Sequence, residues 1–574
     1  MRYHLLATDY DGTLAHGGAV SERTLDALKR LLGSGRRLVM VTGRELPDLQ
    51  KAFSHLDLFE LVVAENGALL YRPSSKTTKR LAAPPPPEFV DELRERGVAP
   101  MSVGEVVVAT WEPHSQAVLD AIRDRGLELQ VIFNKGAVMV LPTGVNKASG
   151  LTAALAELKM SPHNAVGVGD AENDHSFMKL CEASAAVANA LPAVKQTADV
   201  VTESDHGDGV VELVDRMLED DLASVAVGPR LEFGDDEVGE VGLEPYGGCV
   251  LICGASASGK STVAKRLVES LREQSYQFCL VDPEGDYENL TGAVVVGKPN
   301  AAPPLDEALQ LLEDVGVNGV VCLTGVRISD RPKYFVDLFS RLLQMRVRYG
   351  RPHWLVLDEA HHLMPAAWQP PAGVLPQKLR NVVLVTVHPE LLSLDVLRRV
   401  TDIVAVGPTA PDLLARFAEL RDVEIPSAPA PKAPGEVLLW SQASGTCRLV
   451  RVRPPTEEHR RHTRKYAEGH LSPERSFYFR GREKKLNLRA RNLIQFLELA
   501  EGVDAETWEF HLHRGDYSKW FREHIKDDEL AGEAASVEDG GNREKAQSLA
   551  KLREAIERRY TLPATADVPV AGAE

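Results

Sequence analysis

Short apolar runs alternate with amphipathic segments in two separate stretches of this chain of 574 residues. Runs of this kind suit strands that are buried on both faces, and their alternation with helices is typical of parallel sheets. We therefore expect an α/β protein with two doubly wound parallel-sheet domains. The expected strands are at 4–8, 37–41, 61–64, 165–168 and 185–187 in the first stretch, and at 249–253, 278–281, 320–323, 354–357 and 382–387 in the second.

Breaks in this alternation indicate the domain boundaries. The run Pro84–Pro87 precedes a helix–strand–helix–strand–strand pattern, which we interpret as a small cap inserted into the first domain. From 221 to 246 the chain becomes acidic and rich in glycine, as expected for a linker or a small edge structure. The expected layout is a first α/β domain at 1–220 with its cap at about 79–141, a linker at 221–246, a second α/β domain at 247–453, a helical module at 455–560 and a disordered tail at 561–574.

Composition narrows the classes of function. The formal net charge is −17, which disfavours indiscriminate binding to nucleic acid, although one domain can still carry a basic face. No apolar run approaches the ~20 residues that a membrane span needs, and the first apolar run is too short for a signal peptide. We therefore expect a cytoplasmic protein without a membrane partner. Six cysteines lie mostly inside apolar runs, so we expect free core thiols.

Two carboxylates, Asp9 and Asp11, follow the first apolar run and precede a Gly12-Thr13 turn. Ligands of open α/β sheets bind at the edge where such a run ends. Carboxylates at positions i and i+2 can share one Mg²⁺ ion while doing different work. Because a carboxylate attacks phosphorus well only when the charge of the phosphate is masked, the metal ion would make this attack feasible.

Further residues are expected to converge on the same site. Lys147 and the donors around Thr42 and Gly43 would add to the masking of the phosphate charge. An acidic cluster with Asp170 and Asp174 follows another apolar run, so it can reach the same metal ion from a neighbouring strand.

Four elements of this stretch occur in a fixed order that resembles the haloacid dehalogenase superfamily phosphatases of the Cof-like, sugar-phosphatase branch. They are Asp9-Tyr10-Asp11-Gly12-Thr13, Glu65-Asn66-Gly67-Ala68, Gly144-Val145-Asn146-Lys147 and Gly169-Asp170-Ala171-Glu172-Asn173-Asp174.

The resemblance implies a Rossmann-like core with a small α+β cap and assigns roles to the motif residues. Asp9 would be the nucleophile, Asp11 the general acid and base, Thr42 a phosphate ligand and Lys147 the charge-neutralising lysine. Mg²⁺ would be held by Asp9, by the main-chain carbonyl of Asp11 and by Asp170, with support from Asp174. By analogy, the small cap suits a compact substrate such as a sugar phosphate or a phosphoglycolate-like acid.

A glycine-rich loop in the second stretch predicts an ATP site. Gly254-Ala255-Ser256-Ala257-Ser258-Gly259-Lys260-Ser261 follows an apolar run and opens a helix expected at Val263–Arg272. Backbone amides from Ala257 to Ser261 would hold the phosphates, Lys260 would reach the β and γ phosphates, and Ser261 would bind Mg²⁺. The expected ATP contacts are Gly254, Ala257, Ser258, Gly259, Lys260, Ser261 and Thr262.

Asp358 and Glu359 follow the apolar run at 354–357, about a hundred residues after the glycine-rich loop. At that position Asp358 would bind the metal ion of the ATP site, and Glu359 would polarise the attacking water. The pair predicts ATP hydrolysis, with a site that binds ATP without turnover as the alternative.

The segment Val281-Asp282-Pro283-Glu284-Gly285-Asp286-Tyr287 and the element Asp358-Glu359-Ala360-His361 resemble the HerA and FtsK-like motor ATPases. The chain departs from that pattern at Thr386-Val387-His388-Pro389, where those motors carry a glutamine-containing sensor. The resemblance implies a homo-oligomer, a ring-like hexamer in which an arginine of one subunit completes the ATP site of the next. The candidate arginines are Arg327, Arg346, Arg348, Arg380 and Arg398.

The segment after Pro454 is basic, aromatic and rich in expected helices, and it resembles an uncharacterised module that accompanies some phosphatases of this branch. Arginines and lysines interleaved with Phe477, Tyr478 and Phe479 could form a nucleic-acid platform. A basic face that docks on the acidic domains is favoured over this alternative by the overall charge.

The sequence thus predicts a Mg²⁺-dependent phosphomonoesterase that acts on a small sugar or organic phosphate. ATP would be bound and hydrolysed by the second domain in a regulatory or assembly role. The alternative hypothesis is an enzyme that processes or translocates nucleic acid, with a phosphatase and an ATPase or kinase in one chain.

Overall fold

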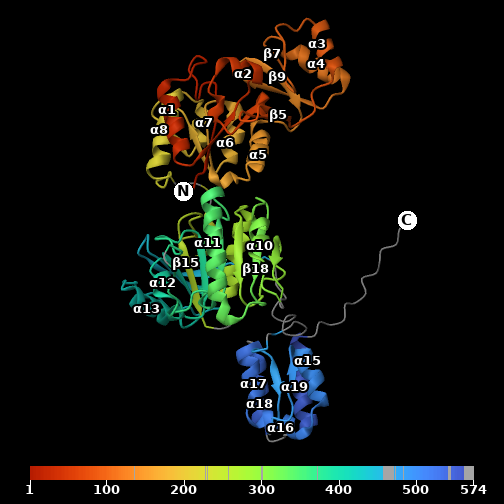
Figure 1. Ribbon diagram of the computed structural model, residues 1–574, viewed down its shortest axis with the longest axis vertical. Helices are drawn as coiled ribbons and strands as arrows, with labels where there is room; N and C mark the ends of the chain where they lie inside the picture. The colour runs from red at the N-terminus through yellow and green to blue at the C-terminus, as the bar shows by residue number, and fades with distance from the viewer. Residues whose placement is uncertain are drawn as a thin grey trace, which may run out of the picture. The chain divides into compact units, whose positions relative to one another are not determined.

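The protein is described here by a computed structural model (Figure 1). Contacts between residues divide the chain into two compact units, Met1–Arg230 with Leu312–Gly316 and Arg341–His353, and Leu231–Leu311 with Val317–Ser340 and Trp354–Glu574. The described residues are 1–134, 136–225, 228, 230–255, 258–298, 301–371, 373–456, 471, 473–482, 484–525, 527–540 and 544–560.

The core of the first unit is a sheet with the strand order β12-β11-β10-β1-β2-β3-β4-β5. Neighbours from β12 to β3 are parallel, and β4 and β5 are added antiparallel at one edge. This confirms the doubly wound fold expected from the apolar runs. The strands are β1 (Leu5–Thr8), β2 (Arg37–Val41), β3 (Leu61–Ala64), β4 (Leu69–Arg72), β5 (Thr77–Arg80), β10 (Ala165–Gly169), β11 (Ala183–Ala186) and β12 (Val200–Val201).

Helices cover this sheet in two groups. The pair α1 and α8 packs together, as does the pair α5 and α6, and the two pairs lie on different sides of the sheet (Figure 1). The central strands β1 and β3 are fully buried between them. The helices are α1 (Glu22–Gly33), α2 (Leu46–Ala52), α5 (Lys147–Glu157), α6 (His175–Leu180), α7 (Pro192–Thr197) and α8 (His206–Glu219).

The cap is a small α+β element with its own core around Phe89, Leu93 and Val140. Its sheet has the order β6-β7-β9-β8, and it follows the expected order of elements apart from the additional two-residue strand β6. Since β5 pairs with β4 in the core sheet, the cap begins only after Arg80. Its elements are α3 (Pro87–Glu95), β6 (Ser102–Val103), β7 (Val108–Trp111), α4 (Ser115–Arg125), β8 (Leu129–Asn134) and β9 (Ala137–Pro142).

The second unit is built on a sheet with the order β14-β13-β23-β22-β21-β15-β20-β19-β16-β18-β17. Neighbours from β21 to β17 are parallel, as predicted, and the strands from β22 to β14 are added antiparallel. The strands are β13 (Leu231–Asp235), β14 (Glu240–Leu243), β15 (Cys249–Gly254), β16 (Phe278–Asp282), β17 (Ala293–Val296), β18 (Asn318–Cys322), β19 (Trp354–Leu357), β20 (Val382–Thr386), β21 (Asp402–Val406), β22 (Glu436–Ser441) and β23 (Cys447–Val452).

The linker expected at 221–246 is too long, because β13 and β14 lie inside it and belong to this second sheet. Arg453 holds them there by ion pairs to Glu232, Asp235 and Glu240. Three of the acidic residues that suggested a linker therefore serve as partners of one arginine, so the description as a small edge structure fits 231–243. The helices of this stretch are α9 (Lys260–Glu273), α10 (Leu305–Leu312), α11 (Arg331–Tyr349), α12 (Leu394–Leu397) and α13 (Ala410–Arg421).

The C-terminal module combines a two-stranded sheet with helices around an aromatic core. Phe477, Phe479, Phe496, Trp508 and Tyr517 are buried against one another. The tail at 561–574 and the basic residues Arg460, Arg461, Arg464 and Lys465 lie outside the described residues. The elements are β24 (Phe477–Phe479), β25 (Leu488–Ala490), α15 (Leu493–Gly502), α16 (Ala505–His513), α17 (Asp516–Trp520), a π-helix at Phe521–Ile525, α18 (Asp528–Asp539) and α19 (Lys545–Tyr560).

The cysteines and the apolar character of the helices bear on two further expectations. The six cysteines are free, as predicted, and five of them are buried. Among the described helices, none has the length and apolar character that crossing a bilayer takes.

Candidate functional site

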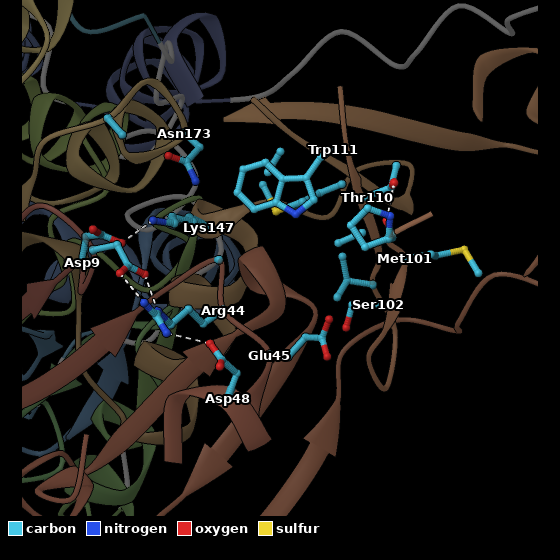
Figure 2. Close-up of a pocket in the computed structure, with 18 residues that line it drawn as sticks. Asp9, Arg44, Glu45, Asp48, Met101, Ser102, Thr110, Trp111, Lys147 and Asn173 are labelled. Atoms are coloured by element: carbon cyan, nitrogen blue, oxygen red, sulfur yellow. Dashed lines mark hydrogen bonds and ion pairs between the residues drawn. The ribbon is translucent and has the colours of Figure 1, made fainter. Parts of the chain in front are cut away.

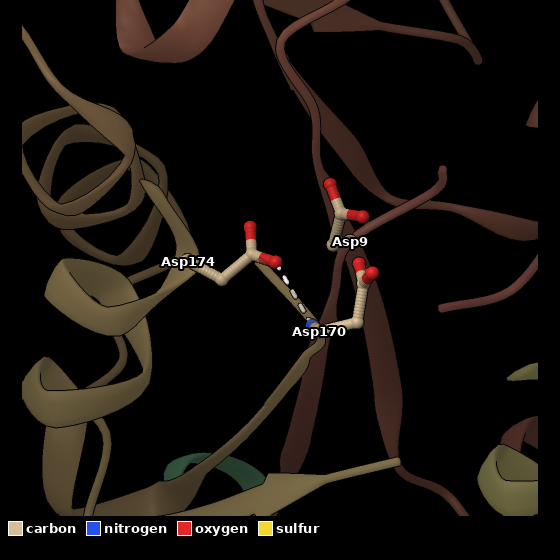
Figure 3. Close-up of side chains that lie close together, drawn as sticks. All are labelled: Asp9, Asp170 and Asp174. Carbon is tan, nitrogen blue, oxygen red and sulfur yellow. Dashed lines mark hydrogen bonds between the residues drawn. The ribbon is translucent and has the colours of Figure 1, made fainter. Parts of the chain in front are cut away.

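Three buried carboxylates meet at the edge of the first sheet where its parallel strands end. Asp9 directly follows β1, and Asp170 directly follows the neighbouring strand β10, so parallel pairing brings the two side by side. Asp174 comes from the short turn after Asp170, and its Oδ2 accepts hydrogen bonds from the backbone N–H groups of Asp170 (3.0 Å) and Ala171 (2.8 Å). One carboxylate oxygen from each aspartate lies within 4.8 Å of the others (Figure 3).

Lys147 joins this cluster from the first turn of α5. Its Nζ donates to Asp9 Oδ1 at 2.6 Å and to Asp174 Oδ1 at 2.5 Å, and its side chain is 2% exposed. The lysine is fixed in place because α5 begins there with a capping box formed by Asn146 and Ser149. Sequence reasoning placed Lys147 at this site, and the structure brings it into contact with two of the carboxylates.

The charges of the cluster are mutually dependent. Burial, reinforced by the charge of Asp174, raises the pKa of Asp9, while Lys147 opposes the rise. Burial lowers the pKa of Lys147, but the carboxylates of Asp174 and Asp9 outweigh it and raise that pKa overall. Three carboxylates against one ammonium group leave an excess of negative charge in a place with little water. A divalent cation would offset this excess.

The donor set fits Mg²⁺, which prefers hard oxygen ligands. The turn next to this cluster requires glycine at position 12. A Cβ atom at Gly12 would lie 2.5 Å from Asp170 Oδ2, and the φ angle of +90° favours glycine. Thr13 Oγ1 donates to Asp170 Oδ1 at 3.2 Å and orients that carboxylate. The carboxylate of Asp11 is not part of this cluster.

Asp11 is instead held by Arg44. Two nitrogens of the guanidinium donate to the two oxygens of Asp11 at 2.6 and 2.7 Å, and a third donates to Asp48 at 2.6 Å. Thr42, at the end of β2, is buried, and its Oγ1 accepts from the backbone N–H of Arg44 at 3.1 Å. Sequence reasoning gave Arg44 no role. The bidentate geometry makes it the residue that orients Asp11.

A cavity of about 650 Å³ opens above the cluster and is lined by both core and cap. Figure 2 shows Thr110 and Trp111 on the cap side, across from Asp9, Arg44 and Lys147 on the core side. The expected phosphate contact Gly43 lines this cavity as well. The lining residues of the cap carry no motif, so the sequence alone gave no signal for them.

A turn at Glu65–Gly67 contacts two segments that line the cavity, the Thr42–Arg44 loop and the N-terminus of α5. The backbone N–H groups of Glu65 and Asn66 donate to the carbonyls of Arg44 (2.9 Å) and Thr42 (3.0 Å). A Cβ atom at Gly67 would lie 1.9 Å from the carbonyl oxygen of Asn146, so only glycine permits this approach to the start of α5. The turn therefore holds the Thr42–Arg44 loop and the N-terminus of α5 at one point.

The same turn reaches the cap through the side chain of Glu65. This carboxylate is fully buried and accepts backbone hydrogen bonds from Glu105 (2.9 Å), Val106 (2.8 Å) and Val107 (2.9 Å). The bonds fix the cap segment whose Val107 lines the cavity. Sequence reasoning found the motif that contains Glu65 but missed this role, because the partner is a backbone segment about forty residues away.

In the second unit, the glycine-rich loop joins β15 to α9 as predicted. Lys260 is the first residue of α9, and its Nζ donates to the carbonyl of Ala255 at 2.9 Å. Gly259 precedes the helix with a φ angle of +105°, and a Cβ atom at Gly254 would lie 2.5 Å from Ser258 Oγ. Ser261 and Thr262 lie in the first turn of α9. Ser256 and the expected phosphate contact Ala257 lie outside the described residues.

The expected carboxylate pair lies at the same edge of this sheet as the loop. Asp358 and Glu359 follow β19, and β19 is separated from β15 only by the parallel strand β20. Burial, together with the charges of Glu359 and Asp282, raises the pKa of Asp358 well above its usual range. Glu359 has a φ angle of +39° and lies 3.5 Å from His361 Nδ1, which in turn contacts Thr386 Oγ1 at 3.1 Å. A strained backbone at Glu359 is typical of a functional position.

Comparison with known proteins agrees with the geometry of both sites. The sequence pattern of the haloacid dehalogenase-like hydrolases matches residues 6–105 and 100–214, and the pattern of an AAA domain matches residues 244–387.

Two curated relatives align with the first part of the chain. Phosphoglycolate phosphatase 2 of Saccharolobus solfataricus is 30% identical over 231 residues, which span 37% of this chain and 92% of the relative. A phosphoglycolate phosphatase of Halorubrum lacusprofundi is 32% identical over 214 residues, 36% of this chain and 92% of the relative. A solved haloacid dehalogenase-like hydrolase from Bacteroides thetaiotaomicron is 22% identical, with a TM-score of 0.34 and coverage of 38% of this chain and 99% of that chain.

Proposed function

Because this chain belongs to the haloacid dehalogenase-like hydrolases, we propose that its first site hydrolyses a phosphomonoester through attack by Asp9. The observation that carries the proposal is the buried cluster of Asp9, Asp170 and Asp174 around Lys147, at the floor of a cavity that the cap covers. The enzyme is a phosphatase joined to an AAA domain, and the assignments of individual residues below are part of the proposal.

The carboxylate of Asp9 attacks phosphorus and forms a phosphoaspartyl group, while the bond from phosphorus to the leaving oxygen breaks. Asp11 donates a proton to that oxygen and later takes one from the water that hydrolyses the phosphoaspartyl group. The two nitrogens of Arg44 orient Asp11 for both transfers. Lys147, Thr42 and Gly43 bind the oxygens of the phosphate. At the end of the cycle Asp9 is a free carboxylate again, and inorganic phosphate and the alcohol leave.

Mg²⁺ would be held by Asp9, Asp170 and the main-chain carbonyl of Asp11, with Asp174 in support, and when bound it offsets the negative charge of the phosphate during attack. The chain's own residues keep the site ready for it. Asp174 and Lys147 position the other two carboxylates, and Thr13 orients Asp170.

The substrate we propose is a small phosphorylated organic acid, with 2-phosphoglycolate as the first candidate. The support is the name of the relatives, which align over almost their whole length at 30% and 32% identity. The cavity of about 650 Å³ suits a compact compound. A sugar phosphate, implied by the Cof-like branch, is the second candidate.

A panel of small phosphates and of oligonucleotides with 3′ and 5′ phosphates tests this proposal. Wild-type protein is expected to release phosphate from 2-phosphoglycolate with the highest kcat/KM. Asp9→Asn is expected to lose at least about a hundredfold of kcat, because a covalent nucleophile is removed. Turnover by Asp9→Asn close to wild type would overturn the mechanism. A clear preference for sugar phosphates or for phosphorylated ends would overturn only the choice of substrate.

For the AAA domain we infer ATP binding and hydrolysis in a regulatory or assembly role. The support is the loop from Gly254 to Ser261 and the pair Asp358 and Glu359 at one sheet edge. The resemblance of the motifs to HerA and FtsK-like ATPases adds a ring-like homo-oligomer to this proposal. In such a ring, an arginine of a neighbouring copy would complete each site.

Measuring ATP turnover per subunit against protein concentration, with sedimentation in the presence of ATP, tests this second proposal. Turnover is expected to rise with concentration, and Glu359→Gln is expected to bind ATP but not hydrolyse it. Constant turnover from a monomer would overturn the ring, and equal turnover in Glu359→Gln would overturn the role of this glutamate. Salt-dependent stimulation of turnover by DNA would favour the alternative of a nucleic-acid enzyme.

A further inference from the structure

A second cavity, of about 490 Å³, lies in the C-terminal module and shares no lining residue with the cavity of the first site. It is bordered by the first part of β24 and the residue before it, by the residues that follow this strand, and by the region from α16 to the π-helix at Phe521–Ile525. The module's aromatic core is complete beneath it. Trp520, for example, lines the cavity while being only 3% exposed, and its Nε1 donates to the carbonyl of Arg475 at 2.9 Å.

Four exposed cationic side chains border this cavity: Arg480, Arg482, Lys484 and Lys519. Within the described part of the chain, no carboxylate lies within 4.0 Å of their charged nitrogens. Some arginines elsewhere in the module are paired, by contrast, as half-buried Arg553 is with Glu501 and exposed Arg558 is with Glu533 at 2.6 Å.

This positive charge is local rather than general. Residues 471–560 contain 17 lysines and arginines and 18 aspartates and glutamates, so the module as a whole is nearly neutral. Two carboxylates, Asp516 and Glu523, also line the cavity. Asp516 already contacts His511 Nδ1 at 2.8 Å and Arg514 Nε at 3.3 Å. The unpaired cations therefore present a field that attracts an anion to this one place.

Two guanidinium groups at the cavity are backed by aromatic rings. The guanidinium carbon of Arg480 lies 4.8 Å from the ring centroid of Tyr478, and that of Arg514 lies 5.2 Å from the ring of Phe510. A guanidinium plane supported by a ring is a flat, cationic surface on which a nucleobase can stack. A site for a simple acidic group would need the cations but not these surfaces.

We propose that this cavity binds a nucleotide unit. Arg482, Lys484 and Lys519 neutralise its phosphate, and its base stacks on the pair of Arg480 and Tyr478. The unit belongs either to a free nucleotide or to a single strand of nucleic acid, which share this chemistry.

Fluorescence anisotropy with the full chain and a 12-nucleotide thymidine strand, labelled at one end and free of terminal phosphate, tests the proposal. Arg480→Ala/Arg482→Ala and Lys484→Ala/Lys519→Ala are each expected to raise Kd at least about tenfold. The double variant Arg553→Ala/Arg558→Ala, which removes two paired arginines of the same module, is expected to change Kd less than twofold. For each phosphate that a variant no longer neutralises, the slope of log Kd against log salt should also fall by about 0.7.

Competition experiments identify the source of the unit. Displacement of the strand by adenosine monophosphate, with displacement weakened in both cavity variants, supports a free nucleotide as ligand. Failure of the mononucleotide to compete, while the cavity variants still weaken strand binding, supports a single strand. Equal affinity in wild type and cavity variants, no binding at 50 mM salt, or equally tight binding of a polyglutamate peptide would overturn the proposal.

Discussion

Replacing Glu65 by glutamine tests how the cap is tied to the catalytic core. The substitution keeps the size of the side chain, so it opens no cavity. One carboxylate oxygen of Glu65 accepts the N–H of Glu105, and the other accepts those of Val106 and Val107. In its best orientation the amide of glutamine keeps one oxygen for two of these donors and turns its NH₂ group toward the third.

The expected loss of free energy follows from this count of hydrogen-bond donors and acceptors. One buried backbone N–H loses its acceptor, which costs about 1–3 kcal/mol, or a factor of roughly 5 to 150 in the equilibrium that holds the segment in place. Because Val107 lines the substrate cavity, we expect kcat/KM of the phosphatase to fall about tenfold while ATP hydrolysis is unchanged.

Hydrogen exchange read on a peptide that covers 100–110 measures this effect locally, which avoids interpreting the unfolding of a chain with several domains. The amides of 105–107 are expected to exchange faster in Glu65→Gln by the factor given above. Glu105→Gln is the control, since it changes the same segment but removes only an exposed ion pair with Arg80, worth about 0.2–1 kcal/mol. Unchanged exchange and unchanged kcat/KM in Glu65→Gln would refute the reasoning.

Three further predictions concern the metal site and the ATP site. Gly12→Ala is expected to reduce kcat/KM of the phosphatase at least about tenfold, because the new Cβ atom would lie 2.5 Å from Asp170 Oδ2. Gly18→Ala is the control: Gly18 has a similar φ of +84°, but a Cβ atom there would meet no other atom within 4 Å, so most phosphatase activity should remain. Mg²⁺ should restore phosphatase activity after treatment with EDTA, and its affinity should fall as the pH falls. Burial and the charge of Asp174 raise the pKa of Asp9, and this carboxyl group must lose its proton to bind the ion. Calorimetry in buffers of different ionisation enthalpy would show the release of this proton, and an affinity that does not depend on pH would contradict the prediction. Lys260→Ala should weaken ATP binding without changing phosphatase kcat/KM, and a parallel loss of both activities would contradict the separation of the two sites.

The sequence was sufficient for the parts of the protein that depend on local pattern. An apolar run followed by an acidic residue predicts a buried parallel strand with a ligand at its end, and Asp9 and Asp170 are positioned in this way after β1 and β10. The glycine-rich loop is local in part: a Cβ atom at Gly254 would lie 2.5 Å from Ser258 Oγ, four residues on, but also 2.7 Å from the carbonyl oxygen of Val406 in β21.

Other pairings between distant segments, unlike the contact of Lys147 with Asp9, were beyond the reach of the sequence. Nothing in the composition of 231–243 distinguishes edge strands from a linker, because their ion pairs with Arg453 form only when residues more than two hundred positions apart meet. The contact of Asp11 with Arg44 likewise depends on the folded arrangement of two loops.

The sequence by itself determined the two sheets, the order of their motifs and the residues that chemistry needs at the strand ends, because each of these rests on side-chain periodicity or on a turn. Only the tertiary structure decided how the cap meets the core at Glu65 and which cations of the C-terminal module stay unpaired. Hydrogen bonds and ion pairs are directional and act over a few ångströms. Their partners are therefore fixed by the packing of whole elements and leave no trace in a local pattern.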